Sequence, residues 1–364
     1  MSSPALAFRP EIATTPWRNC VLPERIPPAS IGPLVNTTNN GPGATARALW
    51  YTAPGQTELR AAPLAAPGPG ELLVRTLYSG ISRGTERLVF EGRIPASEYG
   101  RMRMPTQEGD FPFPVKYGYS AVGRVESGPD GLAGRTVFAL HPHQDRFVLP
   151  EAGVVPVPEN VPPRRAVLAA NLETALNILW DGEAKAGQRI AIVGGGIVGL
   201  LVAALAAQIA GTTVTLIDKE PARAALAEKL GAGFARPEAA PHEMDLVIHT
   251  SASEAGLVLA LEIAGFEANV VEASWYGDKK ISLPLGGAFH SQRLRLISSQ
   301  VGAVAPSHRD RFTHRSRMEE ALRLLADDRF DALLGEEIAF ADLPDHLPRL
   351  LAPDATGVGA LVKY

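Results

Sequence analysis

The sequence of 364 residues predicts an α/β protein with two domains, one a doubly wound parallel sheet and the other rich in short β-strands. Two observations predict the parallel sheet. Apolar runs alternate with helical segments over residues 166–304, and a glycine-rich turn follows the first of these runs. Short strands separated by turn residues over 46–165 predict the β-rich domain, to which we also assign residues 305–364.

The glycine-rich turn is the strongest indication of a ligand. The apolar run 190–193 suits a buried parallel strand, and the apolar stretch 200–209 that follows the turn suits a helix. Strand, turn and helix in this order are typical of the Rossmann dinucleotide-binding unit, in which glycines allow a tight turn, close approach of a pyrophosphate and close packing of helix on strand. The phosphates would lie at the helix N-terminus. The predicted cofactor-binding turn is Gly194, Gly195, Gly196, Ile197, Val198 and Gly199.

The ends of the next two strands predict further cofactor contacts. The strand 213–218 ends in Asp218, where a carboxylate accepts hydrogen bonds from the adenosine ribose and repels a 2′-phosphate. The cofactor is therefore predicted to be NAD, with NADP less favoured. Lys219 follows directly and weakens this preference by its positive charge. Thr250 ends the strand 245–250 and is also assigned to the cofactor site.

Composition and charge exclude several classes of partner. With 46% hydrophobic residues and a net charge of −4, the chain has no feature of a nucleic-acid or membrane protein. The uncharged stretch 190–217 has the length of a membrane span, but its internal glycines divide it into separate elements. The single cysteine, Cys20, rules out a disulfide framework within the chain. No secretory signal is recognisable, so the cytoplasm is the expected location.

The remaining segments complete the predicted architecture. Residues 1–45 are rich in proline and polar residues and are expected to form an extension with little regular structure. A helix over 163–180 is expected to lead from the β-rich domain into the nucleotide domain. A strand over 359–364 closes the chain.

The order of these parts resembles the medium-chain dehydrogenase/reductase superfamily over residues 46–364, and this implies a GroES-like barrel for the β-rich domain. The segment 78–86, Tyr-Ser-Gly-Ile-Ser-Arg-Gly-Thr-Glu, is similar to the family segment that supplies the first catalytic zinc ligand. Lys116-Tyr-Gly-Tyr-Ser-Ala-Val-Gly123 is similar to the Gly-His-Glu segment that supplies the second. Within the superfamily, the chain resembles the group around bacteriochlorophyllide dehydrogenase. The resemblance also implies a homodimer that pairs through an edge strand near 294–297.

The chain departs from that family pattern at every zinc ligand. Ser82 stands in place of the cysteine, Tyr119 in place of the histidine and Ser120 in place of the glutamate. The third ligand position, near Ala169 and Ala170, also lacks a donor. Because neutral hydroxyl groups are poor substitutes for thiolate, imidazole or carboxylate, we predict an enzyme without zinc.

A zinc-free hydride transfer needs another group to polarise or protonate the substrate oxygen. Tyr119 and Ser82 are the first catalytic candidates, because a hydroxyl in the place of the metal can donate a hydrogen bond or a proton. The alternative for both is a packing role. His141 and His143 are the next candidates, since imidazole suits proton transfer near neutral pH. With Asp145 they could instead bind a metal from one face of an extended chain, or form a polar surface turn.

Further site residues follow from the resemblance and from charge. Glu173 is a catalytic candidate, and Thr174 and Arg83 are candidates for cofactor binding, because the family places substrate and nicotinamide near these positions. Six arginines over 293–317 predict either an anionic substrate or a solvated or subunit-facing surface.

The sequence therefore predicts a zinc-independent NAD(P)-dependent oxidoreductase that transfers hydride between nicotinamide and a carbonyl or secondary alcohol of a small molecule. Two alternatives stay open. One is reduction of a polarised C=C bond, as in zinc-free quinone and enoyl reductases. The other is a catalytically retired protein that binds NAD(H).

Overall fold

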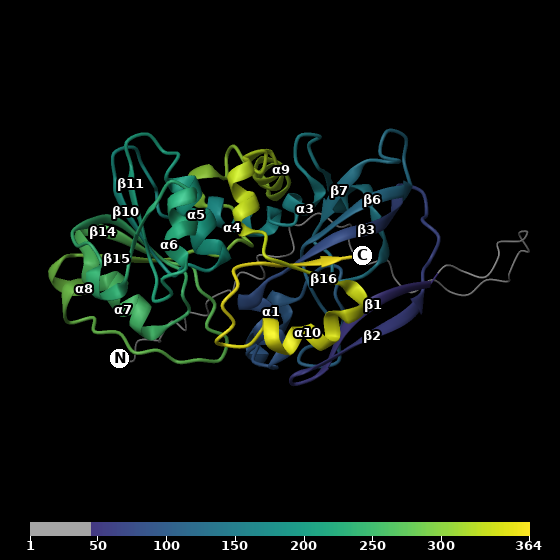
Figure 1. The fold of residues 1–364 in the computed structure, drawn as a ribbon, viewed down its shortest axis with the longest axis horizontal. Helices are drawn as coiled ribbons and strands as arrows, with labels where there is room; N and C mark the ends of the chain where they lie inside the picture. The colour runs from purple at the N-terminus through teal and green to yellow at the C-terminus, as the bar shows by residue number, and fades with distance from the viewer. Residues whose placement is uncertain (1–44) are drawn as a thin grey trace, which may run out of the picture.

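A six-stranded sheet forms the core of one domain in the computed structural model, which describes residues 45–364 (Figure 1). Each pair of neighbouring strands in this sheet is parallel, in the order β12-β11-β10-β13-β14-β15. The predicted extension over 1–45 lies outside the described residues except for its last position. The strands are β10 (Arg189–Val193), β11 (Thr213–Ile217), β12 (Gly233–Ala235), β13 (Met244–His249), β14 (Ala264–Glu272) and β15 (Arg295–Ser298).

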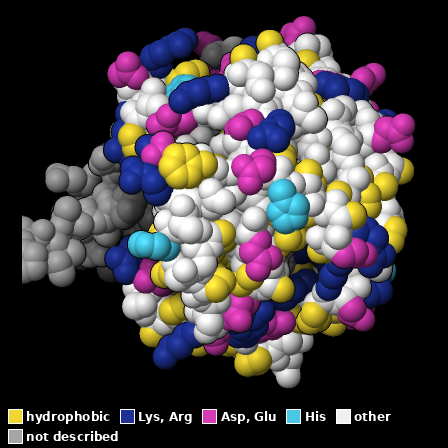
Figure 2. Space-filling model, turned by 90° about the vertical axis from the view of Figure 1, so that its left-hand side faces the viewer, with side chains coloured by type: hydrophobic (Ala, Val, Ile, Leu, Met, Phe, Trp, Pro, Cys, Tyr) yellow, Lys and Arg dark blue, Asp and Glu magenta, His cyan; other side chains and the backbone are white. Residues whose placement is uncertain are grey.

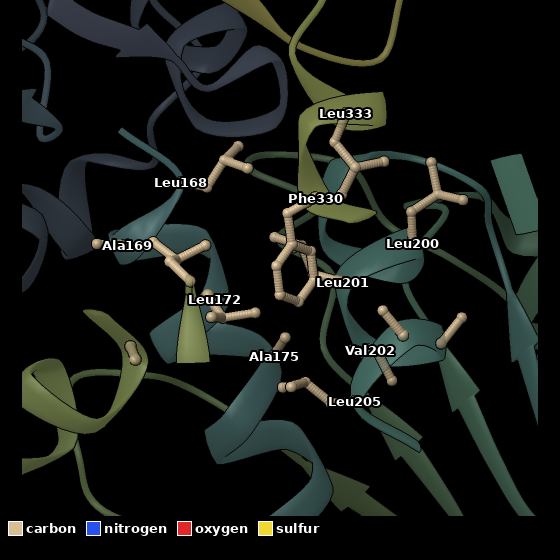
Figure 3. Close-up of a cluster of buried hydrophobic side chains, with 14 of the residues drawn as sticks. Leu168, Ala169, Leu172, Ala175, Leu200, Leu201, Val202, Leu205, Phe330 and Leu333 are labelled. Carbon is tan, nitrogen blue, oxygen red and sulfur yellow. The ribbon is translucent and has the colours of Figure 1, made fainter. Parts of the chain in front are cut away.

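Both faces of this sheet are covered, as the uninterrupted apolar strands predict. Ile190 and Ile192 of β10 belong to one buried cluster, whereas the alternate residues Ala191 and Val193 belong to another on the opposite face. Figure 3 shows the first cluster, in which Phe330 lies against side chains from α4 and α5. The helices on this side of the molecule are α4 (Ala169–Asp181), α5 (Ile197–Ala206), α6 (Arg223–Lys229), α7 (Glu254–Ile263), α8 (Ala288–Ser291) and α9 (His314–Leu324).

The β-rich domain contains two further sheets. One has the order β2-β1-β5-β4, and the other has the order β16-β17-β3-β6-β7-β9 with β8 also paired to β3. The first sheet consists of β1 (Thr45–Ala53), β2 (Gln56–Pro63), β4 (Glu108–Gly109) and β5 (Val115–Lys116). The second consists of β3 (Glu71–Ile81), β6 (Ala121–Ser127), β7 (Thr136–Ala139), β8 (Arg146–Pro150), β9 (Val154–Pro156), β16 (Glu336–Ala339) and β17 (Ala360–Lys363).

The C-terminal segment returns to the β-rich domain, where β17 pairs with β3 (Figure 1). The short helices α1 (Arg83–Phe90), α2 (Tyr99–Met102) and α10 (Leu343–Leu350) lie in the same domain. A doubly wound parallel sheet beside a β-rich domain of this kind confirms the predicted fold class. Within 45–364, no helix is long and apolar enough to cross a membrane.

The connecting helix differs from its prediction. Instead of one helix over 163–180, the chain forms α3 (Pro163–Ala166) and then α4. The Val167 carbonyl between them accepts a hydrogen bond from Ser120 Oγ at 2.5 Å, so this carbonyl is bonded to another part of the fold. The predicted domain boundaries stay predictions. Helix α9, which we assigned to the β-rich domain, buries Met318 and Ala321 in the cluster that covers α4 and α5.

The end of the molecule formed by the parallel sheet carries a mixed charge. Figure 2 shows this face, on which basic and acidic side chains are interspersed and hydrophobic side chains are scattered. Ion pairs in this domain include Arg293 with Glu267 at 2.8 Å and Arg189 with Asp245 at 3.6 Å. The face shown therefore has no extended field of one sign that would favour a highly charged partner.

Candidate active site

A cleft of about 2350 Å³ runs between the two domains. Its lining includes the turn 194–199 on the side of the parallel sheet, and Ser82, Tyr119 and His141 on the side of the β-rich domain. Sites for single small ligands usually measure ~300–1,000 Å³. This cleft therefore has room for a dinucleotide and a substrate together.

The glycine turn has the backbone form that a dinucleotide requires. Gly194 adopts φ +117°, a conformation that side chains disfavour. A Cβ on Gly199 would overlap the Gly194 carbonyl oxygen, so only glycine allows α5 to pack this closely on the turn. At Gly196, in contrast, a Cβ would meet nothing within 4 Å, and this open space faces the cleft. The turn fits a pyrophosphate at the N-terminus of α5.

Asp218 lies beside this turn, directly after β11. Its Oδ2 accepts a hydrogen bond from the Gly195 amide at 2.5 Å, and its Oδ1 accepts one from the Glu220 amide at 2.8 Å. Asp218 lines the cleft together with Lys219 and Arg223. The carboxylate is thus at the position where a ribose diol would bind, with two positive side chains close by. Thr250 lines the cleft on the other side of β10, and its Oγ1 donates to the Gly194 carbonyl at 2.8 Å.

Hydroxyl groups form the opposite wall of the cleft. Burial raises the pKa of Tyr119, and the charge of Glu86 acts in the same direction. The polar side chains of Ser82, Thr85 and Asn171 oppose the increase without cancelling it. The phenol of Tyr119 is therefore protonated at neutral pH and can act as a hydrogen-bond donor in the cleft.

The residues present do not fit a catalytic zinc ion. Ser120 Oγ donates to the Val167 carbonyl, and Ala170 has no donor atom in its side chain. In the part of the chain that the structure describes, no group of three His, Cys, Asp or Glu side chains is arranged to hold a metal. Zinc requires three or four such ligands.

His143 lies behind the cleft wall, in a buried network around Glu86. Oε1 of Glu86 accepts from the Ser82 amide at 2.7 Å, and Oε2 accepts from the Tyr51 hydroxyl at 2.9 Å. His143 Nε2 is 3.1 Å from the same Oε2, and its Nδ1 is 2.7 Å from Ser79 Oγ. His143 therefore holds Glu86 and the segment that carries Ser82, and it is not among the residues that line the cleft.

His141 lines the cleft but does not suit proton transfer near neutral pH. Its ring stacks on Phe147 with centroids 3.9 Å apart, and Nδ1 lies 3.0 Å from the Pro142 carbonyl. Burial is the main cause that lowers the pKa of His141 to about 3; the hydrogen bond to the Pro142 carbonyl opposes it, and the charges of Lys116 and His143 act with it. The imidazole is thus neutral at pH 7. The predicted role of His141 as a proton relay is corrected accordingly.

The His141-Pro-His143-Gln-Asp145 motif does not converge on a metal. His141 contacts Pro142, and His143 contacts Glu86. Asp145 accepts a hydrogen bond from the Arg47 amide at 2.8 Å. Each of the three side chains has a different partner in the structure, so they do not point to one common position.

Glu173 and Thr174 both line the cleft, from helix α4. Glu173 Oε1 accepts from Arg317 Nε at 2.9 Å, and Arg317 is only 1% exposed. Burial raises the pKa of Glu173, and Arg317 opposes this increase. Glu173 is therefore held in a buried ion pair at the cleft wall, and its catalytic role stays a prediction. Thr174 Oγ1 donates to the Ala170 carbonyl at 2.9 Å.

Arg83 joins α1 to the C-terminal loop that borders the cleft. Its guanidinium donates to the carbonyls of Ala355 and Gly357. Arg223, from the other domain, donates to the Thr356 carbonyl of the same loop at 2.6 Å. Burial lowers the pKa of Arg83, and its neighbours Arg87 and Arg223 lower it further. Two positive charges from different domains thus face this part of the cleft.

The six arginines over 293–317 do not form one binding surface. Arg317 is buried against Glu173, and Arg293 pairs with Glu267 outside the cleft. Arg309 and Arg315 line the cleft, where Arg315 pairs with an exposed glutamate. Arg317 also lines the cleft, but its guanidinium is held by Glu173.

Sequence reasoning missed a hydrogen-bonded relay at the carboxyl edge of the sheet. His249 ends β13 and is fully buried, with Nδ1 2.7 Å from Glu272 Oε2 and Nε2 2.6 Å from Ser251 Oγ. Tyr276 donates its hydroxyl to the same Glu272 oxygen at 3.0 Å. Ser251 is exposed and lines the cleft. Strand alternation is the feature of the sequence that could have revealed this relay, because residues two positions apart, such as His249 and Ser251, lie on the same face of an extended chain.

Comparison with solved structures places this architecture among dehydrogenases, although no family model matches the sequence. L-Idonate 5-dehydrogenase from Escherichia coli K-12 superposes with a TM-score of 0.73 at 15% identity, over 88% of this chain and 99% of that one. The chain therefore has a medium-chain dehydrogenase fold. A structure described as that of a zinc-binding dehydrogenase from Sinorhizobium meliloti 1021, bound to NADP, gives a TM-score of 0.70 at 21% identity. The match covers 88% of this chain and 100% of that one. A structure described as that of a short chain alcohol dehydrogenase from E. coli CFT073, complexed with NADH, gives a TM-score of 0.71 at 15% identity and covers 88% of this chain and 100% of that one.

Proposed function

We propose that the protein is an NAD(P)-dependent oxidoreductase that transfers hydride between nicotinamide and a carbonyl or secondary alcohol without zinc. One observation carries the proposal. The glycine cradle over 194–199 and the protonated phenol of Tyr119 face the same cleft from opposite domains. A hydride donor and a proton donor on opposite sides of one space are what carbonyl reduction needs.

Nicotinamide, when bound, supplies the hydride or accepts it. The chain's share is to bind the dinucleotide through the turn 194–199 and Asp218, with Thr250 beside them. Asp218 favours NAD, because its carboxylate would repel a 2′-phosphate. Lys219 and Arg223 line the same region and reduce that preference. The structures that share this fold and were solved with NADP and with NADH support a nicotinamide cofactor in either form.

Tyr119 is the proposed hydrogen-bond donor to the substrate oxygen. Because its phenol is protonated at neutral pH, it can stabilise the negative charge that forms on the oxygen during reduction. Ser82 and Thr85 lie close enough to its hydroxyl to oppose the rise of its pKa. Zinc is not needed for this step, and the residues around Tyr119 do not provide a zinc site. A positioned general acid typically contributes ~10²–10⁴-fold to the rate.

The substrate is proposed to be a small molecule that enters between Tyr119 and the turn 194–199. Among small molecules, the resemblance to the bacteriochlorophyllide dehydrogenase group suggests a bulky substrate. A cleft of about 2350 Å³ would admit such a substrate beside a dinucleotide. Arg309 and Arg315 would favour an anionic group. We also propose that the protein is a homodimer through β15, which ends the parallel sheet and carries Leu296 at 39% exposure.

The test is a turnover assay in which NADH absorbance is followed with ketones, secondary alcohols, quinones and enones. We expect turnover of a ketone or secondary alcohol, no stoichiometric zinc by elemental analysis, and a loss of about 100-fold or more in kcat in Tyr119→Phe. NADH affinity should not change in this variant. Tyr78→Phe is the matched control, because Tyr78 packs against the core and does not line the cleft.

Three results would contradict the proposal. Stoichiometric zinc would refute the zinc-free mechanism. Turnover of quinones or enones alone would favour the C=C reductase. NADH binding with no turnover over the whole panel would favour a catalytically retired protein that binds NAD(H).

A further inference from the structure

A buried donor on the cleft wall has no partner in the fold. Gln107 is 6% exposed and lines the cleft from the β-rich domain. Its Oε1 accepts a hydrogen bond from the Met104 amide at 3.3 Å, and this contact fixes the side-chain amide, because only the oxygen can accept. Nε2 of Gln107 is buried and has no hydrogen-bond partner among the described residues. An unpaired buried donor is unfavourable, so a ligand that brings an acceptor to this wall is favoured.

His141 provides the complementary acceptor. Its imidazole is neutral at pH 7, because burial lowers its pKa to about 3. Nδ1 lies 3.0 Å from the Pro142 carbonyl, which can only accept, so the single ring hydrogen is on Nδ1. Nε2 therefore has a free lone pair and no hydrogen. In the described part of the chain, the bond to Pro142 is the only hydrogen bond of this ring.

A hydrogen bond between their neighbours brings Gln107 and His141 to the same part of the wall. Thr106 Oγ1 donates to the Leu140 carbonyl at 3.1 Å. Thr106 directly precedes Gln107, and Leu140 directly precedes His141. All four residues line the cleft. The wall thus offers one donor and one acceptor close together, each without a partner in the protein.

Strand pairing puts this part of the wall beside Tyr119. Strands β6 and β7 are antiparallel, and the first residue of β6 is opposite the last residue of β7. The His143 amide donates to the Tyr117 carbonyl at 3.3 Å, so the pairing continues beyond both strands in the same register. His141 is then opposite Tyr119, and opposed side chains lie on one face with their Cβ atoms about 4.5–5.5 Å apart. A substrate whose oxygen meets Tyr119 has its neighbouring atoms at this wall.

We propose that Gln107 and His141 together bind a hydroxyl group on the carbon next to the reacting carbonyl, so that the substrate is an α-hydroxy ketone or, in the reverse direction, a vicinal diol. A hydroxyl group accepts from Gln107 Nε2 and donates to His141 Nε2. A carboxylate only accepts and an ammonium group only donates, so each would leave one of the two residues unpaired. The position of the hydroxyl group rests on the proposed function, in which Tyr119 binds the reacting oxygen.

The experiment compares three ketones that differ at one position. α-Hydroxyacetophenone carries the hydroxyl group, acetophenone lacks it, and α-methoxyacetophenone has an oxygen that accepts but cannot donate. Their affinities for the full chain are measured by calorimetry with NAD present, which has no hydride to transfer to a ketone, and kcat/KM is then measured with NADH. The wild type should bind α-hydroxyacetophenone about tenfold more tightly than acetophenone, because two neutral hydrogen bonds are gained. The methoxy compound should lie between them.

Two variants test the two residues separately. Gln107→Leu should bind α-hydroxyacetophenone about three- to tenfold more weakly and acetophenone as before. Gln107→Glu, which keeps an oxygen for the Met104 amide, should show the same loss and serves if the leucine variant does not fold. His141→Phe keeps a ring to stack on Phe147 and should bind the hydroxy and methoxy compounds equally. A thermal melt checks that each variant is folded.

Thr106→Val is the matched control, because it changes the same segment but removes a hydroxyl group that is already bonded to Leu140. It should keep the wild-type preference for α-hydroxyacetophenone. An equal loss of preference in Thr106→Val and Gln107→Leu would show a structural role of the segment and overturn the inference. Equal affinity of the wild type for α-hydroxyacetophenone and acetophenone, or no binding of either, would also overturn it. The expected preference without turnover of any ketone would refute the proposed function and support the hydroxyl site.

Discussion

Removing the buried imidazole of His141 should make the protein less sensitive to acid. His141 is 5% exposed, stacks on Phe147 and has a pKa lowered to about 3, mainly by burial. In the unfolded chain, a histidine has a pKa of about 6.5. We propose His141→Asn, because the asparagine amide can still donate to the Pro142 carbonyl, but it cannot bind a proton.

The sign and size of the effect follow from proton linkage. Between pH 6.5 and 3 the unfolded chain binds a proton at His141 that the folded chain does not bind, so stability is lost as pH falls. One such group costs about 1.4 kcal/mol per pH unit. From pH 7 to about 4.5 the wild type should lose about 2.5 kcal/mol more of its free energy of unfolding than His141→Asn does.

The measurement is equilibrium urea unfolding, followed by tryptophan fluorescence, at several pH values between about 7 and 4.5. The difference between wild type and variant is the relevant quantity, because other titrating groups largely cancel in it. Lys116 and His143, which lie near the His141 imidazole, are present in both proteins, so their own contributions to the free energy of unfolding should largely cancel in this difference. His242→Asn, at an exposed histidine, controls for the loss of an ionisable group from the unfolded chain. Parallel curves for wild type and His141→Asn would refute the reasoning.

Two further predictions concern the turn and the buried ion pair. Gly199→Ala should lower the melting temperature and abolish NADH binding, because its Cβ overlaps the Gly194 carbonyl, whereas Gly196→Ala should melt like the wild type and lose only NADH binding. Equal melting temperatures for the two would contradict this distinction. Arg317→Met should cost about 3–5 kcal/mol in urea unfolding, because it leaves Glu173 buried without its partner, and adding Glu173→Leu should restore much of the loss. A double variant no more stable than Arg317→Met would contradict the ion-pair account.

The parts of the fold that depend on residues close together in the sequence could be predicted from the sequence. The run over 190–193 becomes β10, and Gly199 packs on Gly194 as the glycine spacing implies. Both follow from local rules, namely hydrophobic periodicity and the space that a glycine leaves. The predicted fold class depends on the same local patterns, and the structure confirms it. The break between α3 and α4 was not predictable, because it involves Ser120, which precedes β6 and is 47 positions away from Val167 in the chain.

Electrostatic roles were harder to predict, because they depend on burial. The arginines over 293–317 look alike in sequence, yet Arg317 is 1% exposed and Arg293 is on the surface. Helix α9 makes the difference by packing against α4, where Glu173 lies 144 positions away in the chain. His141 likewise has a sequence context that suits proton transfer, but the ring of Phe147 removes it from water and keeps it neutral. Charge pattern alone does not contain this information.

The relay at Ser251 shows which information would have been enough. His249 lies in the predicted strand 245–250, and continuing its alternation by one residue would place Ser251 on the same side. Glu272 could be added only from the register of β13 and β14, in which His249 pairs with Glu272. A shift of this pairing by one residue would turn the carboxylate to the opposite face of the sheet. The hydrogen bond between His249 and Glu272 thus depends on a strand register that pairs residues 23 positions apart in the chain.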